Sequence, residues 1–302
     1  MAIHNPNQAM SRIFFNVLLL LIPFAGMSAE NSPSAGKPIL SLTGEINDRK
    51  ILDTLTTQAN LMMQNGRATK AETFASQLDR RLCALKLAKP GKRRLSAGEL
   101  SEKCRAGVVV VAQPYVCDRC HRVHNQIASG FMLTDDGAFC TSFHVLSNRT
   151  AKTMIILTGD GRIAPVREVL AASPGADLVI LRAEGSGFSP LPLSTDAPVG
   201  SIVRVISHPN QRFYSLTEGI VSRQFEHTHR RKTNSMIAIT ADFAKGSSGA
   251  PVLNETGAVV ASVNNTFSSY YDSDDEGHKE NLQMVFKNCV SSRHILELIE
   301  PK

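Results

Sequence analysis

Short apolar runs separated by turn residues fill the chain from Val108 to its last helix. The runs are rich in β-branched residues, and Asp-Gly, Gly-Asp-Gly, Pro-Gly and Thr-Gly turns lie between them. About a dozen such runs, with no helix between them, indicate a mostly β fold, either a barrel or a sandwich. One helix, at about 292–300, is expected to close the chain. The expected strands are 108–111, 127–134, 139–143, 154–157, 166–171, 178–181, 202–206, 216–223, 236–241, 252–253, 258–263 and 282–286.

The preceding part of the chain has helical periodicity instead. Apolar residues share one face of a first helix over 51–63. A Thr-Lys-Ala-Glu capping box opens a second helix at Thr69, whose apolar stripe runs to Leu85 and which we expect to end at Pro90-Gly91. A Ser-Ala-Gly-Glu box at Ser96 opens a third. Roughly 60 residues form too small a unit to be stable alone, so this segment should pack on the β-rich region. It could be a removable pro-segment, a partner-binding arm or a brace.

The first 29 residues are typical of a secretory signal. Arg12 precedes a mostly apolar run, 13–24, and small residues come after it. The run is shorter than the ~20 residues of a membrane span. We therefore expect a signal peptide at 1–29, a linker and helical segment at 30–105, and a β domain at 106–302. The mature protein should be periplasmic or secreted, without a stable membrane span, in a compartment where disulfides can form.

Composition narrows the partners. The 302 residues carry a formal charge of +6, and their length suggests one or two domains. Basic residues cluster at 86–94 and 227–232 without the interleaved aromatic residues of a single-strand nucleic-acid groove. We therefore expect no nucleic-acid partner.

One turn, Gly246-Ser247-Ser248-Gly249-Ala250-Pro251, lies between two apolar runs and has the composition of a nucleophile loop. Glycines around a serine allow uncommon backbone angles. Such angles let the hydroxyl stand clear and aim N–H groups at an oxygen that becomes negative. The alternative is a Gly/Ser-rich hairpin turn.

A histidine and an aspartate at strand ends could complete this chemistry. His144 comes directly after the expected strand 139–143, and its pKa suits proton transfer near pH 7. Asp177 opens an apolar strand, and a carboxylate beside an imidazole fixes its tautomer and stabilises its protonated form. His144 could instead be a core histidine, and Asp177 a turn residue. His208, in Ser-His-Pro, is a weaker candidate for the base and better fits a structural role.

In their order along the chain, the three segments resemble the trypsin-like serine peptidase family. The matching boxes are Thr141-Ser-Phe-His144-Val, Ala176-Asp177-Leu-Val-Ile-Leu and Gly246-x-Ser248-Gly-Ala-Pro. The resemblance covers roughly 106–300 and is closest to the bacterial Deg/HtrA-type branch. It implies a chymotrypsin-type double β-barrel with six strands in each barrel. The chain ends soon after the expected second barrel, so we expect no PDZ domain.

The resemblance also implies roles for these residues. Ser248 would be the nucleophile, His144 the general base and acid, and Asp177 the orienting carboxylate. The N–H groups of Gly246 and Ser248 would form the oxyanion hole. The implied activity is hydrolysis of protein or peptide substrates through an acyl-enzyme, with no required cofactor. Phe143 and Ala250 depart from the usual small residue and second glycine, but neither change removes a reacting group.

Asp242 lies six residues before Ser248. Trypsin-type enzymes carry at this spacing the acid that selects Lys or Arg, so Asp242 is a candidate substrate-binding residue. It could equally cap a local loop.

Six cysteines, at 83, 104, 117, 120, 140 and 289, suit an exported protein. A Cys83–Cys104 bridge would tie the second helix to the third. Cys117-Asp-Arg-Cys120-His121, with His124 beyond it, has three interpretations: a small disulfide, a structural zinc site that includes His121 or His124, or a c-type haem attachment.

Two rival functions stay open. The double barrel could be a catalytically silent binding module, or the chain could carry a metal or redox equivalents through Cys117 and Cys120. The patterns leave the oligomeric state open as well.

Overall fold

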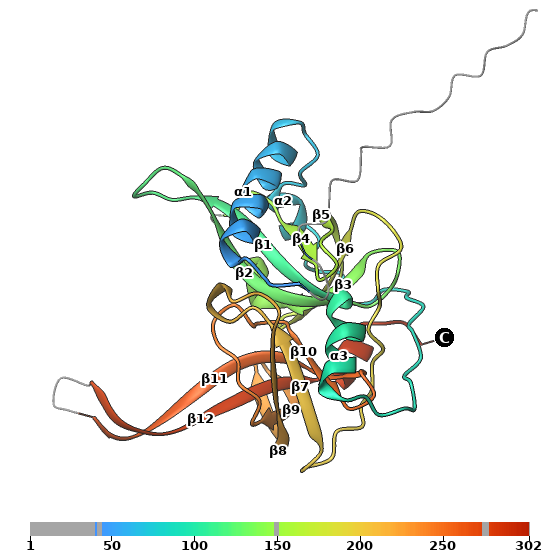
Figure 1. The fold of residues 1–302 in the computed structure, drawn as a ribbon, viewed down its shortest axis with the longest axis vertical. Coiled ribbons are helices and arrows are strands. Elements are labelled where there is room, and N and C mark those ends of the chain that lie inside the picture. Colours follow the sequence, from blue (N-terminus) through green and yellow to red (C-terminus); the bar gives the residue numbers. More distant parts are fainter. Residues whose placement is uncertain (1–39, 41–43, 148–150, 274–277, 302) are drawn as a thin grey trace, which may run out of the picture. The chain divides into compact units, whose positions relative to one another are not determined.

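The computed structural model describes residues 40, 44–147, 151–273 and 278–301; the expected signal peptide lies outside them. Twelve antiparallel strands form two closed barrels of six, in the orders β1-β2-β3-β6-β5-β4 and β10-β11-β12-β9-β8-β7. Figure 1 shows the first barrel in green and the second in yellow to red. The strands are β1 (Val108–Val116), β2 (Val123–Met132), β3 (Ala138–Ser142), β4 (Ile155–Thr158), β5 (Ile163–Ser173), β6 (Leu178–Ala183), β7 (Ile202–Ser207), β8 (Ser215–His229), β9 (Lys232–Ile239), β10 (Pro251–Asn254), β11 (Val259–Ser273) and β12 (Lys279–Ser291).

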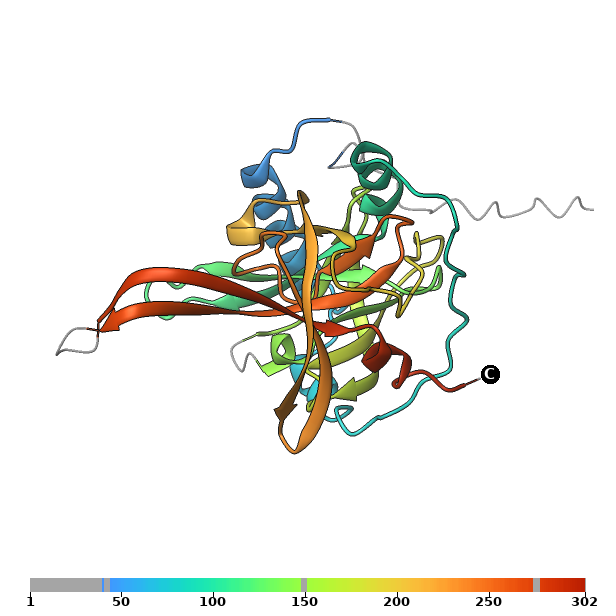
Figure 2. The ribbon, with the colours of Figure 1, turned by 90° about the horizontal axis from the view of Figure 1, so that it is seen from below.

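These strands confirm the predicted mostly β double barrel, and each predicted apolar run falls on one of them. The predicted runs underestimate two hairpins, β8–β9 and β11–β12. In β12 the first six residues are exposed and only the end is buried. An exposed half-strand lacks the apolar signal that marks a buried one. The β11–β12 hairpin extends well beyond its barrel in Figures 1 and 2.

Strand β1 of the first barrel is buried on both faces. Val108 and Val110 belong to a core that includes residues of helix α1 (Asp48–Gln64), whereas Val109 and Val111 belong to a separate core. Alternate residues of a strand point to opposite faces. The continuous valine run of β1 is therefore explained by burial on both faces.

Helix α1 packs on the first barrel, as the amphipathic pattern predicts. Ile51, Leu55 and Ala59 are 0–1% exposed and join the core that contains β1. Helix α3 (Ala97–Cys104) begins with the predicted capping box, in which Ser96 and Glu99 bond each other's backbone N–H groups. The helices and both barrels belong to one compact unit, Lys37–Lys302. No helix within the described ranges is long and apolar enough to cross a membrane.

The second helix is shorter than predicted. Helix α2 covers only Ala71–Ala75, and Lys70 rather than Thr69 is its N-cap, without a side-chain bond. The chain then runs along the protein surface. Arg80 binds Glu168 and the carbonyl of Val169 on β5, and Cys83 pairs with Ile299 as a β-bridge. These tertiary contacts override the local helical pattern. The last helix, α4 (Arg293–Leu296), is likewise shorter than the expected 292–300.

The expected Cys83–Cys104 disulfide is wrong. All six cysteines are free. The sulfur of Cys83 lies 3.3 Å from the carbonyl oxygen of Leu298, while that of Cys104 lies 3.8 Å from the carbonyl oxygen of Gly257. Because the predicted second helix ends early, Cys83 is carried to the C-terminal segment instead of to α3.

Candidate active site

The loop between β9 and β10 carries Ser248, and its glycines are required by its shape. Gly246 and Gly249 have φ of 99° and 84°, which side chains rarely tolerate. A Cβ on Gly246 would lie 2.5 Å from the carbonyl oxygen of His208, and one on Gly249 would lie 2.4 Å from that of Ser129. The sequence therefore specifies a tight loop against two neighbouring segments.

Ser129 on β2 ties this loop to the first barrel. Its backbone N–H donates to the carbonyl oxygen of Ser248 at 2.9 Å, and its hydroxyl donates to that of Gly246 at 2.8 Å. Both carbonyl groups are thereby turned toward β2. The position of Ser248 depends on a contact between the two barrels.

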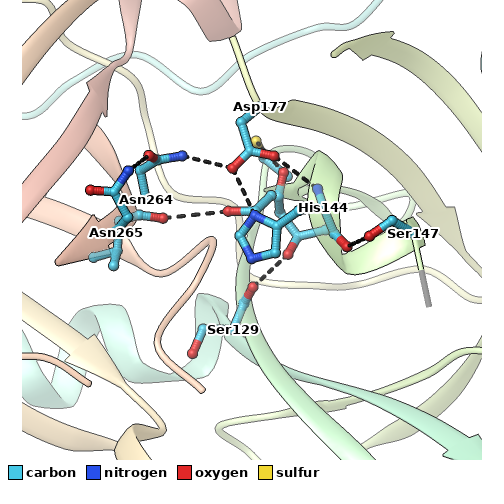
Figure 3. Close-up of polar contacts among 10 residues, drawn as sticks. Ser129, His144, Ser147, Asp177, Asn264 and Asn265 are labelled. Atoms are coloured by element: carbon cyan, nitrogen blue, oxygen red, sulfur yellow. Dashed lines mark hydrogen bonds and ion pairs between the residues drawn. The ribbon is translucent and has the colours of Figure 1, made fainter. Parts of the chain in front are cut away.

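His144 and Asp177 lie together, in the 3-10 turn after β3 and immediately before β6. The Nδ1–H of His144 donates to Oδ2 of Asp177 at 2.7 Å, and the backbone N–H of His144 donates to Oδ1 at 2.8 Å. A carboxylate only accepts, so the proton of a neutral imidazole is on Nδ1 and Nε2 is free to accept. Figure 3 shows the ring directly against the carboxylate.

Sequence reasoning missed a further member of this group, Asn264. Its Nδ2 donates to Oδ2 of Asp177 at 2.7 Å, the same oxygen that accepts from the His144 ring (Figure 3). The amide orientation is set because the Oδ1 of Asn264 accepts from Asn265 at 2.7 Å. Neither Asn264 nor Ser129 belongs to the three sequence boxes, and only their placement in space reveals their contacts.

Both Ser248 and His144 line one cavity of about 620 Å³ between the barrels. The first barrel contributes Tyr115, Asn125 and Gln126 to its wall, and the second contributes Asn210, Lys245 and Gly246. Across the residues with described positions, the Ser248 hydroxyl forms no hydrogen bond with the His144 ring. Such bonds are often long without substrate and tighten in the complex.

The backbone N–H groups of Gly246 and Ser248 are available to a ligand. In the described part of the chain, neither donates to a backbone acceptor. Gly246 and Ser248 both line the cavity, beside His144. Two N–H groups without a backbone acceptor therefore belong to residues on the wall of this cavity, and a developing oxyanion needs donors of this kind.

The pKa of His144 is raised above its ordinary value, chiefly by its hydrogen bond to Asp177. The carboxylate stabilises the protonated ring. His208, in contrast, is fully buried, and burial lowers its pKa to about 3. The backbone N–H of Tyr214 donates to its Nδ1 at 3.1 Å. His208 therefore remains neutral and has the structural environment that the sequence suggested.

Asp242 lies away from this group. Its side chain is 82% exposed, and its Oδ1 pairs with Nζ of Lys287 at 2.8 Å. Its carboxylate faces Lys287 and solvent, and its part in substrate selection stays a sequence prediction.

The cysteine motif forms a separate cluster. The ligand atoms of Cys117, Cys120 and His124 lie within 4.8 Å of one another at the tip of the β1–β2 hairpin. His121 is not a member of this group.

Two closed six-stranded barrels, with Ser248 and His144 on a cavity between them and Asp177 hydrogen-bonded to His144, form the two-barrel architecture that the sequence resemblance implied. Residues 128–261 match the family described as trypsin-like peptidase domain. This part of the chain is therefore similar to trypsin-like peptidase domains, as the sequence boxes indicated.

Curated proteins with similar sequences are named as serine proteases. The probable periplasmic serine endoprotease DegP-like of Ectopseudomonas mendocina is 30% identical over 141 residues, 46% of this chain and 29% of that protein. The protein of the same name in Halomonas elongata is 29% identical over 136 residues, 44% of this chain and 28% of that protein. The chain is thus a distant relative of DegP-like proteases, and its matched part spans less than a third of their length.

A solved structure with the same fold is the HtrA-type protease AlgW with tripeptide. It has a TM-score of 0.53 at 16% identity, covering 67% of this chain and 62% of that one. At this identity the likeness shows the fold alone.

Proposed function

We propose that this protein is an exported serine endopeptidase in which Ser248, His144 and Asp177 form the catalytic triad. The observation that carries the proposal is that His144, which is hydrogen-bonded to Asp177 at 2.7 Å, lines the same cavity as Ser248. The match of residues 128–261 to the trypsin-like peptidase domain supports the reaction type. The apolar run 13–24 and the periplasmic relatives support export.

The reaction would proceed through an acyl-enzyme. The Oγ of Ser248 attacks the carbonyl carbon of the substrate while Nε2 of His144 takes its proton. The N–H groups of Gly246 and Ser248 bind the resulting oxyanion, and each such donor is worth about 2.7–4 kcal/mol in the transition state. His144 then protonates the leaving amine. Water, deprotonated by His144, releases the acid and restores the Ser248 hydroxyl.

Asp177 acts without changing its protonation. It holds the proton of His144 on Nδ1 and stabilises the imidazolium that forms when Nε2 takes the proton of Ser248. Asn264 is a positioning residue, since it holds the carboxylate and not the substrate.

Hydrolysis of an unfolded model protein tests the proposal. The wild-type protein should cleave it, and Ser248→Ala should lose at least ~10³-fold in rate. Ser222→Ala is the matched control, because Ser222 is exposed on β8, away from the cavity. Equal cleavage by wild type and Ser248→Ala would overturn the assignment. Binding of the model protein by the wild type without cleavage would instead favour a silent binding module.

A further inference from the structure

The tip of the β1–β2 hairpin brings together three side chains that bind soft metal ions. Cys117 comes directly after β1, Cys120 lies in the turn, and His124 is the second residue of β2. Nε2 of His124 is 3.0 Å from the sulfur of Cys120, and all three ligand atoms are within 4.8 Å of one another. Thiolate and imidazole are the ligands that Zn²⁺ prefers in proteins.

The turn itself is built around Cys117. Its backbone N–H donates to the carbonyl oxygen of Arg122 at 2.9 Å, and its carbonyl oxygen accepts from His121 at 2.8 Å.

The ligand atoms are close enough together to surround one ion. Zn–S bonds of about 2.3 Å and Zn–N bonds of about 2.0–2.1 Å place tetrahedral ligand atoms roughly 3.6–3.8 Å apart. In the cluster the sulfur of Cys120 is 3.0 Å from Nε2 of His124 and no pair is more than 4.8 Å apart, so the side chains would have to shift to reach the tetrahedral spacing. We propose that Cys117, Cys120 and His124 bind one Zn²⁺ at the hairpin tip, with water as the fourth ligand.

The arrangement favours a metal over the other two interpretations of the motif. A disulfide would use the two sulfurs and leave the close approach of His124 unexplained. Haem attachment would use His121, the residue directly after Cys120, yet His124 is the histidine that lies against the sulfurs. The His124 ring also packs on Tyr115, with centroids 5.9 Å apart, which helps to fix its direction.

The metal would stiffen one wall of the cavity that contains Ser248. Tyr115 pairs directly with His124 across the hairpin, and Tyr115, Asn125 and Gln126 line that cavity. Asn125, the residue after His124, also donates to Thr56 of α1 at 2.8 Å, which ties this part of the hairpin to the helix. Zn²⁺ would add an anchor at the tip and so support substrate binding; this consequence rests on the proposed peptidase function, whereas the metal site does not.

Titration with Co²⁺ tests the site directly. The purified protein, reduced and stripped with a chelator, should bind one equivalent of Co²⁺ with thiolate-to-metal absorption and release it to Zn²⁺. Cys117→Ser, Cys120→Ser and His124→Ala should each weaken Zn²⁺ binding by at least about 100-fold. Cys83→Ser and His229→Ala are matched controls outside the cluster and should bind as the wild type does.

Three outcomes would overturn the site: no stoichiometric binding by the wild type, binding unchanged in the three variants, or a metal-free Cys117–Cys120 disulfide in protein purified without reductant.

The consequence for the cavity is tested by the rate of fluorophosphonate labelling with and without Zn²⁺. A several-fold slower rate is expected after zinc removal, and only in proteins with the intact cluster. Equal labelling rates with and without Zn²⁺ would refute the effect of the metal on the cavity. Absent labelling with intact Co²⁺ binding would refute the peptidase function alone.

Discussion

Three donors converge on the carboxylate of Asp177. They are the backbone N–H and Nδ1–H of His144 and the Nδ2 of Asn264, at 2.7–2.8 Å. Asp177 also has a φ of 55°, a value uncommon outside glycine and often found at functional sites. Because both of its oxygens accept hydrogen bonds, the carboxylate is fixed in one orientation toward the His144 ring.

Replacing Asn264 with alanine should lower kcat while changing KM little. A hydrogen bond to a charged group is worth about 1.5–3 kcal/mol, so the expected loss is roughly 10- to 100-fold. Steady-state kinetics on a peptide substrate measure it. Gln283→Ala, which removes an exposed amide on β12, is the control. An unchanged kcat in Asn264→Ala would contradict the positioning role.

The activity should depend on the ionisation of His144. Only the neutral ring can accept the proton of Ser248, so kcat/KM should rise with pH through the pKa of His144. The hydrogen bond to Asp177 raises this pKa, so the midpoint should lie above the ~6.5 of an unperturbed histidine. Asp177→Asn removes the negative charge, and its midpoint should shift to lower pH while its maximal rate falls. A midpoint that stays or rises in that variant would count against the pairing.

At this scale the sequence identified the three residues of the proposed triad but not the residues that contact them. Ser248, His144 and Asp177 lie in short boxes with recognisable neighbours. Asn264 and Ser129 act through hydrogen bonds to residues far away in the chain, and those bonds arise from the contact between barrels. Local spacing carries no information about such contacts.

At the scale of elements, the loop that carries Ser248 requires glycine at positions where a side chain would clash. Gly249→Ala should destabilise the protein by at least about 1–2 kcal/mol, because alanine disfavours this φ and its Cβ would meet Ser129 and Thr141. It should also abolish hydrolysis. Gly98→Ala in α3 is the control: its Cβ meets nothing within 4 Å, and it should be neutral or stabilising by ~0.5–1 kcal/mol. Urea unfolding measures both; similar stabilities for the two variants would contradict the steric account.

The pattern of apolar residues located every strand but not every helix. The buried part of each barrel strand is apolar and can be recognised in the sequence. The exposed ends of β8, β9, β11 and β12 lack this apolar pattern and were not predicted. The predicted length of the second helix was wrong because the residues after Ser76 contact β5 and the C-terminal segment. A single-sequence pattern contains the propensity of that stretch but not these partners.

For the whole molecule, the helical segment before β1 packs as part of the same compact unit as the two barrels. Leu55→Ala should lower the free energy of unfolding by about 2–5 kcal/mol, because this side chain is 0% exposed in the core shared with β1. Leu61→Ala on the same helix should cost less than about 0.5 kcal/mol, since Leu61 is 47% exposed. Equal effects in denaturant unfolding would mean that α1 does not brace the barrel.

The proposed catalysis by Ser248 depends on features at all three scales. Covalent labelling with a fluorophosphonate tests it most directly. The wild-type protein should take up close to one label per chain, mapped by peptide mass spectrometry to Ser248. Ser248→Ala should take up none, and Ser222→Ala should label as the wild type does. A label on a different residue, or a folded wild-type protein that takes up none, would contradict the account.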